Sequence, residues 1–138
     1  MCVRLRIRHA SDVFVARRKV RELGARVGLS EAAIAALATA ASELARNIVV
    51  HAGIGEILVG TLADSSRHGV VVIARDNGPG ILDITQAMHD GHSTAAGLGL
   101  GLPSARRLVD EFDIESTVGV GTTVTLRKWT SPKKSSRQ

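Results

Sequence analysis

One stretch of helical periodicity in the first third of the chain is the strongest constraint on the fold. Between residues 31 and 52, apolar side chains recur every three or four positions, with Ser30 available as an N-cap and Gly53 as a stop. This spacing predicts a helix with a single buried face, which has to pack on another element. The residues of that face are Ile34, Leu37, Ala41, Leu44 and Ile48.

Two further helices are predicted, one after the first strand segment and one before the last two. Residues 12–27 have the same period, and either Ser11 or Asp12 can serve as the N-cap. Residues 102–112 form a shorter helical pattern. The residues before it, 81–101, have weak periodicity and are expected to form a mobile connection.

Five segments have the alternation or the β-branched apolar runs that are typical of strands. The second and third are joined by a polar loop, and the last two by a glycine turn, so each pair predicts a hairpin. Helices followed by hairpins indicate an α+β fold, a two-layer sandwich with helices on one face of a mostly antiparallel mixed sheet. We expect one domain over residues 1–129 and a disordered basic tail, residues 130–138. The strand segments are residues 3–8, 56–62, 69–75, 112–117 and 122–129.

Charge and composition restrict the classes of partner. The net charge is +5, but the chain has only one Trp, two Phe and no Tyr to stack on bases, so nucleic acid is not expected as a partner. Cys2 is the only cysteine, which excludes an internal disulfide and agrees with a reducing cytoplasm. The longest strongly apolar runs, residues 32–41 and 70–74, are far shorter than the roughly 20 residues that span a membrane. We therefore expect a cytoplasmic protein that does not enter a membrane.

A glycine-rich segment leads into the helix predicted at residues 102–112. Glycine allows close approach of a ligand to the backbone, and N–H groups at a helix start suit phosphate. The segment is equally compatible with a flexible loop that binds nothing. The hydroxyl of Thr94 could likewise contact a phosphate or simply be solvated in a loop. It is not the dinucleotide fingerprint, because Leu102 stands where that pattern needs glycine. The segment consists of Gly97, Leu98, Gly99, Leu100 and Gly101.

Three polar residues elsewhere could carry chemistry. Glu43 and Asn47 are one helical turn apart and border the buried stripe. They could be an ordinary hydrogen-bonded pair on the helix surface or part of a site. Asp76 ends an apolar strand before a Gly-Pro-Gly turn. Its carboxylate could accept the amides of that turn or an exocyclic amine at the mouth of a pocket. The residues alone leave both alternatives open.

Taken in order, four segments resemble the N, G1 and G2 boxes and the closing Gly-Thr of the GHKL ATP-binding superfamily. They are ELARN at residues 43–47, DNGPGI at 76–81, GLGLG at 97–101 and GTT at 121–123. The resemblance extends from about residue 3 to residue 129. Within the superfamily, the chain is similar to the anti-sigma-factor serine kinases, and in finer detail to the RsbT-type switch kinases of the stressosome.

The resemblance implies a Bergerat-type fold and a site for ATP and Mg²⁺. Asp76 would bind the adenine amino group, with Thr122 assisting through water. Asn47 would be the protein ligand of Mg²⁺, which completes its octahedron with phosphate oxygens and waters. Glu43 would be the general base for a serine hydroxyl. The nucleotide-binding residues implied in this way are Asn47, Asp76, Gly78, Gly80, Ile81, Thr94, Gly97, Leu98, Gly99, Leu100, Gly101 and Thr122.

One departure from the related kinases concerns the lid before the last glycines. Those kinases have an arginine there, whereas this chain has no Lys or Arg between Asn77 and Ala105. Cationic assistance is worth about three to five orders of magnitude in other phosphoryl-transfer enzymes. We therefore predict Mg-ATP binding more firmly than fast kinase turnover; a slow switch enzyme would tolerate the lack of a cation there.

The resemblance also implies partners. The leading hypothesis is a protein-serine kinase that phosphorylates a STAS-domain antagonist and, once released, activates a PP2C-type phosphatase. The alternatives are an anti-sigma factor that sequesters a sigma factor, and a nucleotide-gated interaction module with negligible kinase activity. The strand at residues 3–8 and the helix at 12–27 could also support a homodimer.

Overall fold

The computed structural model describes residues 1–81, 83–88 and 101–131. Predicted site residues Thr94, Gly97, Leu98, Gly99 and Leu100 lie outside the described residues, as do residues 132–138 of the predicted tail. In chain order the elements are β1 (Cys2–Ile7), α1 (Ala10–Val27), α2 (Glu31–Asn47), the π-helical turn η1 (Ile48–Ala52), β2 (Gly55–Ala63), β3 (His68–Asp76), α3 (Ile84–Ala87), α5 (Leu102–Leu108), β4 (Glu111–Thr117) and β5 (Gly121–Trp129).

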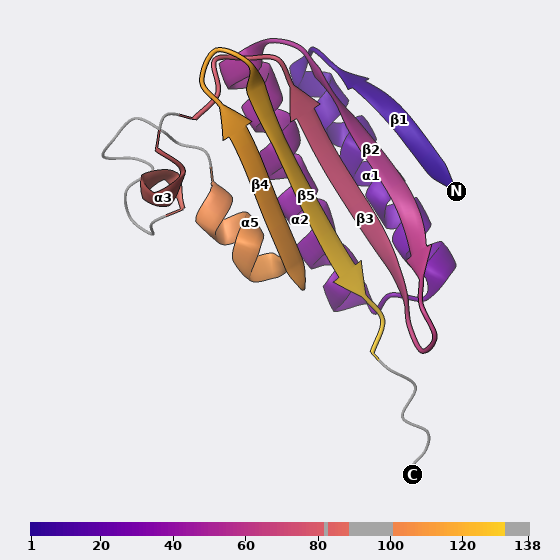
Figure 1. Ribbon diagram of the computed structural model, residues 1–138. Helices are drawn as coiled ribbons and strands as arrows, with labels where there is room; N and C mark the ends of the chain where they lie inside the picture. Colours follow the sequence, from indigo (N-terminus) through magenta and orange to yellow (C-terminus); the bar gives the residue numbers. More distant parts are fainter. Residues whose placement is uncertain (82, 89–100, 132–138) are drawn as a thin grey trace.

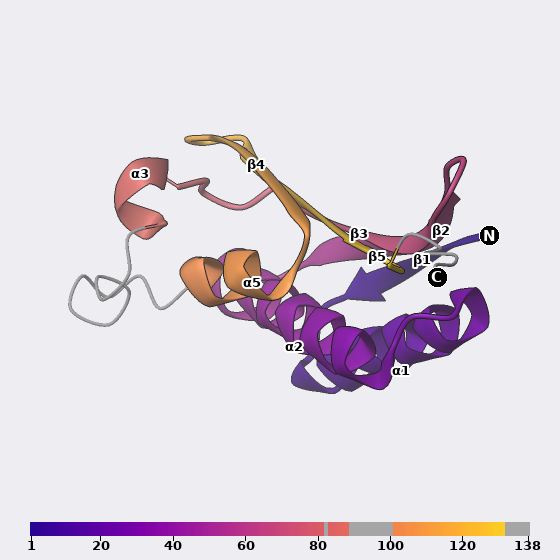
Figure 2. The same cartoon turned by 90° about the horizontal axis from the view of Figure 1, so that it is seen from below.

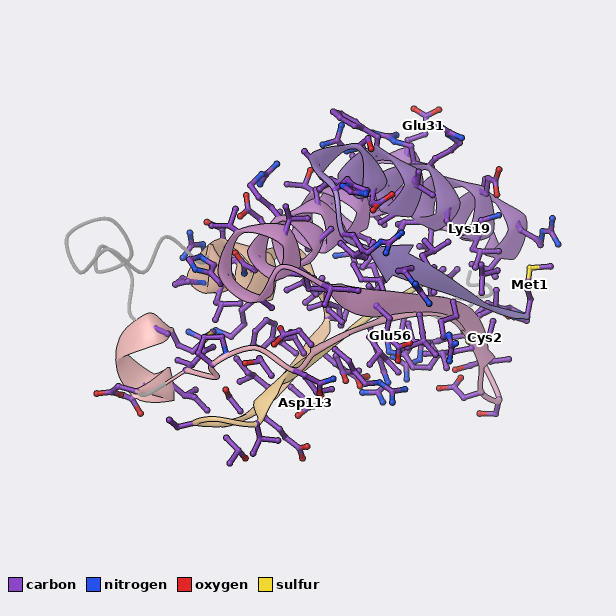
Figure 3. All side chains as sticks on the ribbon, turned by 90° about the horizontal axis from the view of Figure 1, so that it is seen from above. Met1, Cys2, Lys19, Glu31, Glu56 and Asp113 are labelled. Atoms are coloured by element: carbon purple, nitrogen blue, oxygen red, sulfur yellow. The ribbon has the colours of Figure 1, made fainter. Side chains whose placement is uncertain are left out.

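The five strands form one sheet in the order β1-β2-β3-β5-β4, and every neighbouring pair is antiparallel. Helices α1, α2 and α5 cover one face of this sheet (Figure 2). The opposite face carries charged side chains, among them Glu56 and Asp113 (Figure 3). This arrangement confirms the predicted α+β sandwich with helices on one face.

The core lies between α2 and the middle of the sheet. The predicted helix stripe is buried at Leu37, Ala41, Leu44 and Ile48, and half-buried at Ile34. Side chains of alternate strand positions meet it from the sheet; they include Ile57, Val59, Val70, Val72, Val124 and Leu126. Alternation along the strands therefore places one set of residues in the core and the next set on the open face.

The start of α1 differs from the prediction. Its N-cap is His9, rather than Ser11 or Asp12, and Asp12 lies in the first turn. The Asp12 carboxylate accepts hydrogen bonds from the backbone N–H groups of Arg8 (2.8 Å) and His9 (2.9 Å). These bonds hold the pKa of Asp12 below its usual value. Asp12 thus fixes the entry of the helix from its third position, as in a capping box.

The late helix is shorter than predicted. It ends at Leu108 instead of residue 112, because Val109 is extended and Phe112 belongs to β4. The Asp110 N–H donates to the carbonyl of Arg127 at 3.0 Å, so pairing with β5 replaces the last helical turn. The predicted connection over residues 81–101 contains the short helix α3.

Helix α2 and η1 together are more apolar than the uninterrupted runs in the sequence indicate. By length and composition alone, the 22-residue helical stretch Glu31–Ala52 could cross a membrane, since an 18-residue window within it has a mean hydropathy of 1.4. Half of that window is buried inside the structure. Because α1 packs on one side of α2 and the sheet covers another (Figure 2), the composition is that of a central core helix.

Candidate functional site

Glu43 and Asn47 belong to the last turns of α2. The C-terminal end of this helix lies at the upper end of the sandwich in Figure 1. Both side chains are half-buried, beside the fully buried Leu44 and Ile48. The helix then widens into η1, where the N–H of Gly53 donates to the carbonyl of Ile48 at 2.7 Å. π-Helical turns of this kind are rare overall, but those that occur are often found at functional sites. The sequence pattern predicted only continued α-helix here.

The end of the glycine-rich segment lies against Glu43. Gly101 has a φ of 65°, a left-handed value, and immediately precedes α5. A Cβ atom added to Gly101 would lie 2.9 Å from Cδ of Glu43 and closer still to Oε1. The structure therefore brings together two residues predicted for the site from segments 58 positions apart. Only glycine allows this approach without moving the carboxylate.

The Glu43 carboxylate also has a cationic neighbour. Nη1 of Arg46 lies 3.1 Å from Oε2 of Glu43, and the two side chains are 50% and 31% exposed. A half-exposed pair of this type contributes little to stability. Its relevance is positional, because Arg46 places positive charge at the end of the site where the segment 77–105 has none. Arg46 was not among the predicted site residues, although its i,i+3 spacing to Glu43 is visible in the sequence.

Asp76 ends β3 at the same end of the sheet. Its Oδ1 accepts the N–H of Gly78 at 2.8 Å, so the turn-stabilising role considered for Asp76 is present. The carboxylate stays partly exposed at the rim. A carboxylate has acceptor capacity beyond one hydrogen bond, so the turn role and a contact with an exocyclic amine are compatible.

Glycines join the Asp76 turn to the end of α2–η1. A Cβ on Gly55 would lie 2.9 Å from Cγ2 of Ile48 and 3.1 Å from Cβ of Asp76. A Cβ on Gly78 would lie 2.7 Å from Cβ of Ala52 in η1. These close approaches connect the Glu43–Asn47 end of the helix to the Asp76 end of the sheet. Gly55 was missed in the sequence, where it reads only as the residue before a strand.

The predicted residue Thr122 lies directly opposite Asp76. In the β3–β5 register Asp76 pairs with Thr122, and in the β4–β5 register Thr122 pairs with Ser116. These three residues thus form a row across adjacent strands on the helix-covered face. The Ser116 and Thr122 hydroxyl oxygens are 2.8 Å apart. Ser116 Oγ also accepts the N–H of Ile81 at 2.7 Å, which anchors that predicted residue beside the row.

Another predicted glycine, Gly80, adjoins the turn between β4 and β5. Its φ is +80°, and an added Cβ would lie 2.9 Å from the carbonyl carbon of Thr117. Gly80 therefore closes the rim between the Asp76 turn and β4. The predicted residues inside the described part of the chain all lie at this end of the sheet; they are Glu43, Asn47, Asp76, Gly78, Gly80, Ile81, Gly101 and Thr122.

The donor atoms at this end are compatible with Mg²⁺ held together with a phosphate ligand. The amide oxygen of Asn47 is a hard ligand of the kind that Mg²⁺ takes together with phosphate oxygens and waters. Among the described residues there is no group of three or more His, Cys, Asp or Glu side chains able to hold a metal. A magnesium ion at this place would therefore take most of its ligands from phosphate oxygens and water, as it commonly does.

Comparison with known proteins agrees with this geometry. Residues 8–128 match the family described as "Histidine kinase-like ATPase domain". The chain is 44% identical over 125 residues to the serine/threonine-protein kinase RsbT of Bacillus subtilis, covering 91% of this chain and 94% of that protein. It is 32% identical over 105 residues to the anti-sigma F factor of Thermoanaerobacter pseudethanolicus, covering 73% of each.

A solved structure is similar in fold. The crystal structure of the RsbU and RsbW domains of a Mycobacterium tuberculosis protein superposes with a TM-score of 0.57 over 91% of this chain, at 23% identity. This chain spans about a third of that longer chain, 32%. The fold, the order of the glycine-rich segments and these similarities agree, and the chain belongs to the histidine kinase-like ATPase domain family.

Proposed function

We propose that this chain is an ATP-dependent protein-serine kinase that switches between protein partners in a stress or sigma-factor pathway. One observation carries the proposal: the continuous segment α2–η1 contacts both Gly101, at the end of the glycine-rich segment, and the turn after Asp76. A single continuous element thus sets the spacing between the phosphate-binding end and the adenine-binding end of one site. The similarity to the kinase RsbT over nearly the full length of both chains supports the same function.

Each residue has a distinct role in this proposal. Asp76 accepts a hydrogen bond from the adenine amino group, and Asn47 provides an amide oxygen for Mg²⁺. The glycines that end at Gly101 bring backbone N–H groups to the phosphates. When bound, Mg²⁺ supplies neutralisation of the charge on the phosphate oxygens.

Glu43 is the proposed general base. Its carboxylate takes the proton of the substrate serine hydroxyl as the serine oxygen bonds to the γ-phosphorus of ATP. The bond from that phosphorus to the β,γ-bridging oxygen breaks, and ADP leaves with the electron pair. Gly101 and Arg46 hold the carboxylate from two sides, which restricts its orientation. Positioning of this kind is the main contribution of the protein in phosphoryl transfer.

Slow turnover fits a switch. The segment 77–105 contains no Lys or Arg, so cationic help at the γ-phosphate has to come from another part of the chain or from the substrate. A regulator whose output is the choice of partner needs one transfer per switching event. A slow kinase is therefore favoured over a high-turnover enzyme.

The partners belong to this proposal as well. A STAS-domain antagonist is the substrate, and a PP2C-type phosphatase is the protein activated after release, all in the cytoplasm. The second candidate, binding of a sigma factor, has support from the shorter and less similar match to anti-sigma F factors. Co-purification of a sigma factor with this chain would favour the second candidate over the first.

Charge distribution supports an acidic partner. Residues 1–29, which form β1 and α1, carry eight Lys or Arg and two Asp or Glu, whereas residues 30–138 carry ten and eleven. The excess positive charge therefore lies on one side of the molecule, away from α5. Complementary charge raises the association rate of two proteins more than it raises their affinity. Reversal of the exposed Arg18 to Glu should slow association with the partner, whereas the same reversal at the exposed Arg106 of α5 should not.

The proposal is tested by adding labelled ATP, Mg²⁺ and a neighbouring STAS-domain protein to the purified chain. Transfer to a serine of the STAS protein is expected for the wild type. Glu43→Gln should retain ATP affinity and lose transfer, because the amide cannot accept the serine proton. Transfer by Glu43→Gln at the wild-type rate would exclude Glu43 as the base. ATP binding without transfer would favour the nucleotide-gated module.

A further inference from the structure

Arg46 stands beside the proposed base, and the proposed function uses only one of its N–H groups. Its Nη1 donates to Oε2 of Glu43 at 3.1 Å, and its side chain is 50% exposed. A guanidinium has five N–H donors, and Glu43 is the partner of Arg46 within the described part of the chain. Most of these donors can therefore bind a ligand without breaking another contact.

The two oxygens of the Glu43 carboxylate face different neighbours. Oε1 lies toward Gly101, where an added Cβ would touch it, and Oε2 accepts from Arg46. A single carboxylate group therefore separates the Arg46 guanidinium from the backbone at the end of the glycine-rich segment. Because this backbone is the proposed seat of the phosphates, Arg46 lies at the phosphate-binding end of the site.

This end of the site is short of positive charge for a nucleotide. The segment 77–105 contains no Lys or Arg, and Glu43 adds a negative charge. The last turn of α2 also lies here, and the C-terminal end of a helix disfavours anions. Arg46 is the basic residue of that turn. Its planar guanidinium can bind two phosphate oxygens at once.

Two other arginines in this part of the molecule have partners elsewhere. Arg17 of α1 donates from Nε to the hydroxyl of Ser42 at 3.0 Å, and Ser42 is buried. Arg75 of β3 pairs with Glu56 at 3.7 Å, on the open face of the sheet. Arg46, by contrast, is half-exposed and in contact with the proposed base.

We propose that Arg46 exchanges partners in the reaction: its guanidinium leaves Glu43 and binds oxygens of the γ-phosphate, as the cation that the segment 77–105 lacks. This inference rests on the proposed ATP site. The exchange costs little, because an exposed ion pair contributes little to stability. It leaves Glu43 free to take the serine proton while the serine oxygen bonds to the γ-phosphorus, and the β,γ-bridging oxygen keeps the electron pair of the bond that breaks. Arg46 neither gains nor loses a proton in this step.

The test compares the affinities for ATP and for ADP, both with Mg²⁺ and without a protein substrate. Only ATP has a γ-phosphate, so Arg46→Gln should lower the ATP-to-ADP affinity ratio about tenfold, the effect of one charge-assisted hydrogen bond. Arg46→Lys keeps the charge and should lose less. Arg106→Gln removes an exposed cation from the last turn of α5 and should leave the ratio unchanged.

Three results of this comparison would overturn the inference. A wild-type ratio in Arg46→Gln would mean that the guanidinium does not touch the γ-phosphate. An equal fall in Arg106→Gln would mean that any nearby charge has the same effect. An equal loss in Arg46→Lys would mean that the positive charge is not what binds. If Arg46→Gln does not fold, Arg46→Met replaces it, with the same expected fall and the same refuting result.

A second background separates a phosphate contact from mere support of Glu43. Arg46→Gln should slow transfer to the STAS protein about 100-fold, the effect of removing one preorganised donor at a reacting group. Loss of Glu43 orientation alone would also slow transfer, but it would leave the affinity ratio unchanged. In a Glu43→Gln background, Arg46→Gln should therefore still lower the ratio. A fall that disappears in this background would mean that Arg46 acts only through Glu43, and would overturn the inference.

The same measurements distinguish failure of this inference from failure of the proposed function. If wild-type protein binds neither ATP nor ADP, the ATP site itself fails and the role of Arg46 fails with it. If the wild type binds both nucleotides and phosphorylates the STAS protein, but Arg46→Gln keeps the wild-type ratio, only the role of Arg46 fails.

Discussion

Replacement of Gly101 by alanine should separate backbone strain from catalysis. Gly101 has a left-handed φ of 65°, which costs about 1–2 kcal/mol for an L-residue with a side chain. The added Cβ would also fall 2.9 Å from Cδ of Glu43. The atoms that it meets belong to the end of a half-exposed side chain, so the carboxylate can swing away at little further cost in folding free energy. The catalytic group is then displaced while the fold persists.

Gly28 offers a matched control. It ends α1 with a φ of 90°, and a Cβ added there meets nothing within 4 Å. Gly28→Ala and Gly101→Ala should therefore lower the free energy of unfolding by similar amounts, about 1–2 kcal/mol each. Denaturant titration measures both values. Only Gly101→Ala should reduce phosphoryl transfer, by about 100-fold or more, because general bases typically contribute 10²–10⁴-fold.

Two outcomes would refute this reasoning. Wild-type transfer by folded Gly101→Ala would mean that the position of the Glu43 carboxylate does not matter for the reaction. A loss of stability much larger than that of Gly28→Ala would mean that Glu43 cannot move away. Transfer is measured with labelled ATP at saturating nucleotide, so that a weakened affinity does not imitate a lower rate.

Three further substitutions test separate parts of the account. Asn47→Ala should abolish Mg²⁺-dependent nucleotide binding, and retained binding in calorimetry would contradict the ligand assignment. Asp76→Asn should weaken ATP affinity by about tenfold, because an amide is a poorer acceptor than a carboxylate; unchanged affinity would contradict adenine recognition. Asp12→Ala should lower the free energy of unfolding by about 1 kcal/mol, because the cap at the start of α1 is lost, and thermal denaturation would measure this change. Because backbone bonds from Arg8 and His9 lower the pKa of Asp12, this stabilisation should be present above the unfolded pKa and be lost as pH falls through the folded pKa.

The strands and the two long helices could be predicted because their signals are local. Ser30 caps α2 as expected, with its hydroxyl accepting the Ala33 N–H at 3.1 Å. Alternation gave each strand to within about two residues, since one face of the sheet is covered and the other is exposed. The predicted end of α5 was wrong, because Leu108, Val109 and Phe112 keep a spacing that fits a helix and no Gly or Pro between them marks a stop. Only pairing with β5, a contact distant in sequence, makes that stretch a strand.

The residues of the candidate site also fall into those that local motifs predict and those that only the fold brings together. Glu43, Asn47 and Asp76 could be proposed from the sequence because their residue types and spacing match short motifs. Ser116 and Gly55 were missed because their roles depend on contacts across the sheet: Ser116 reaches Ile81 over 35 positions, and Gly55 touches Asp76 over 21. The π-helical turn was missed because a change from i+4 to i+5 hydrogen bonding leaves no mark on apolar periodicity over a single turn.

Calorimetric titration of the wild-type protein with ATP, with and without Mg²⁺, tests the central claim most directly. The account predicts saturable binding of one ATP per chain that requires Mg²⁺ and disappears when the metal is chelated. Absence of binding under both conditions would contradict the ATP site built from α2–η1, Asp76 and Gly101. Binding of equal strength without Mg²⁺ would contradict the role assigned to Asn47.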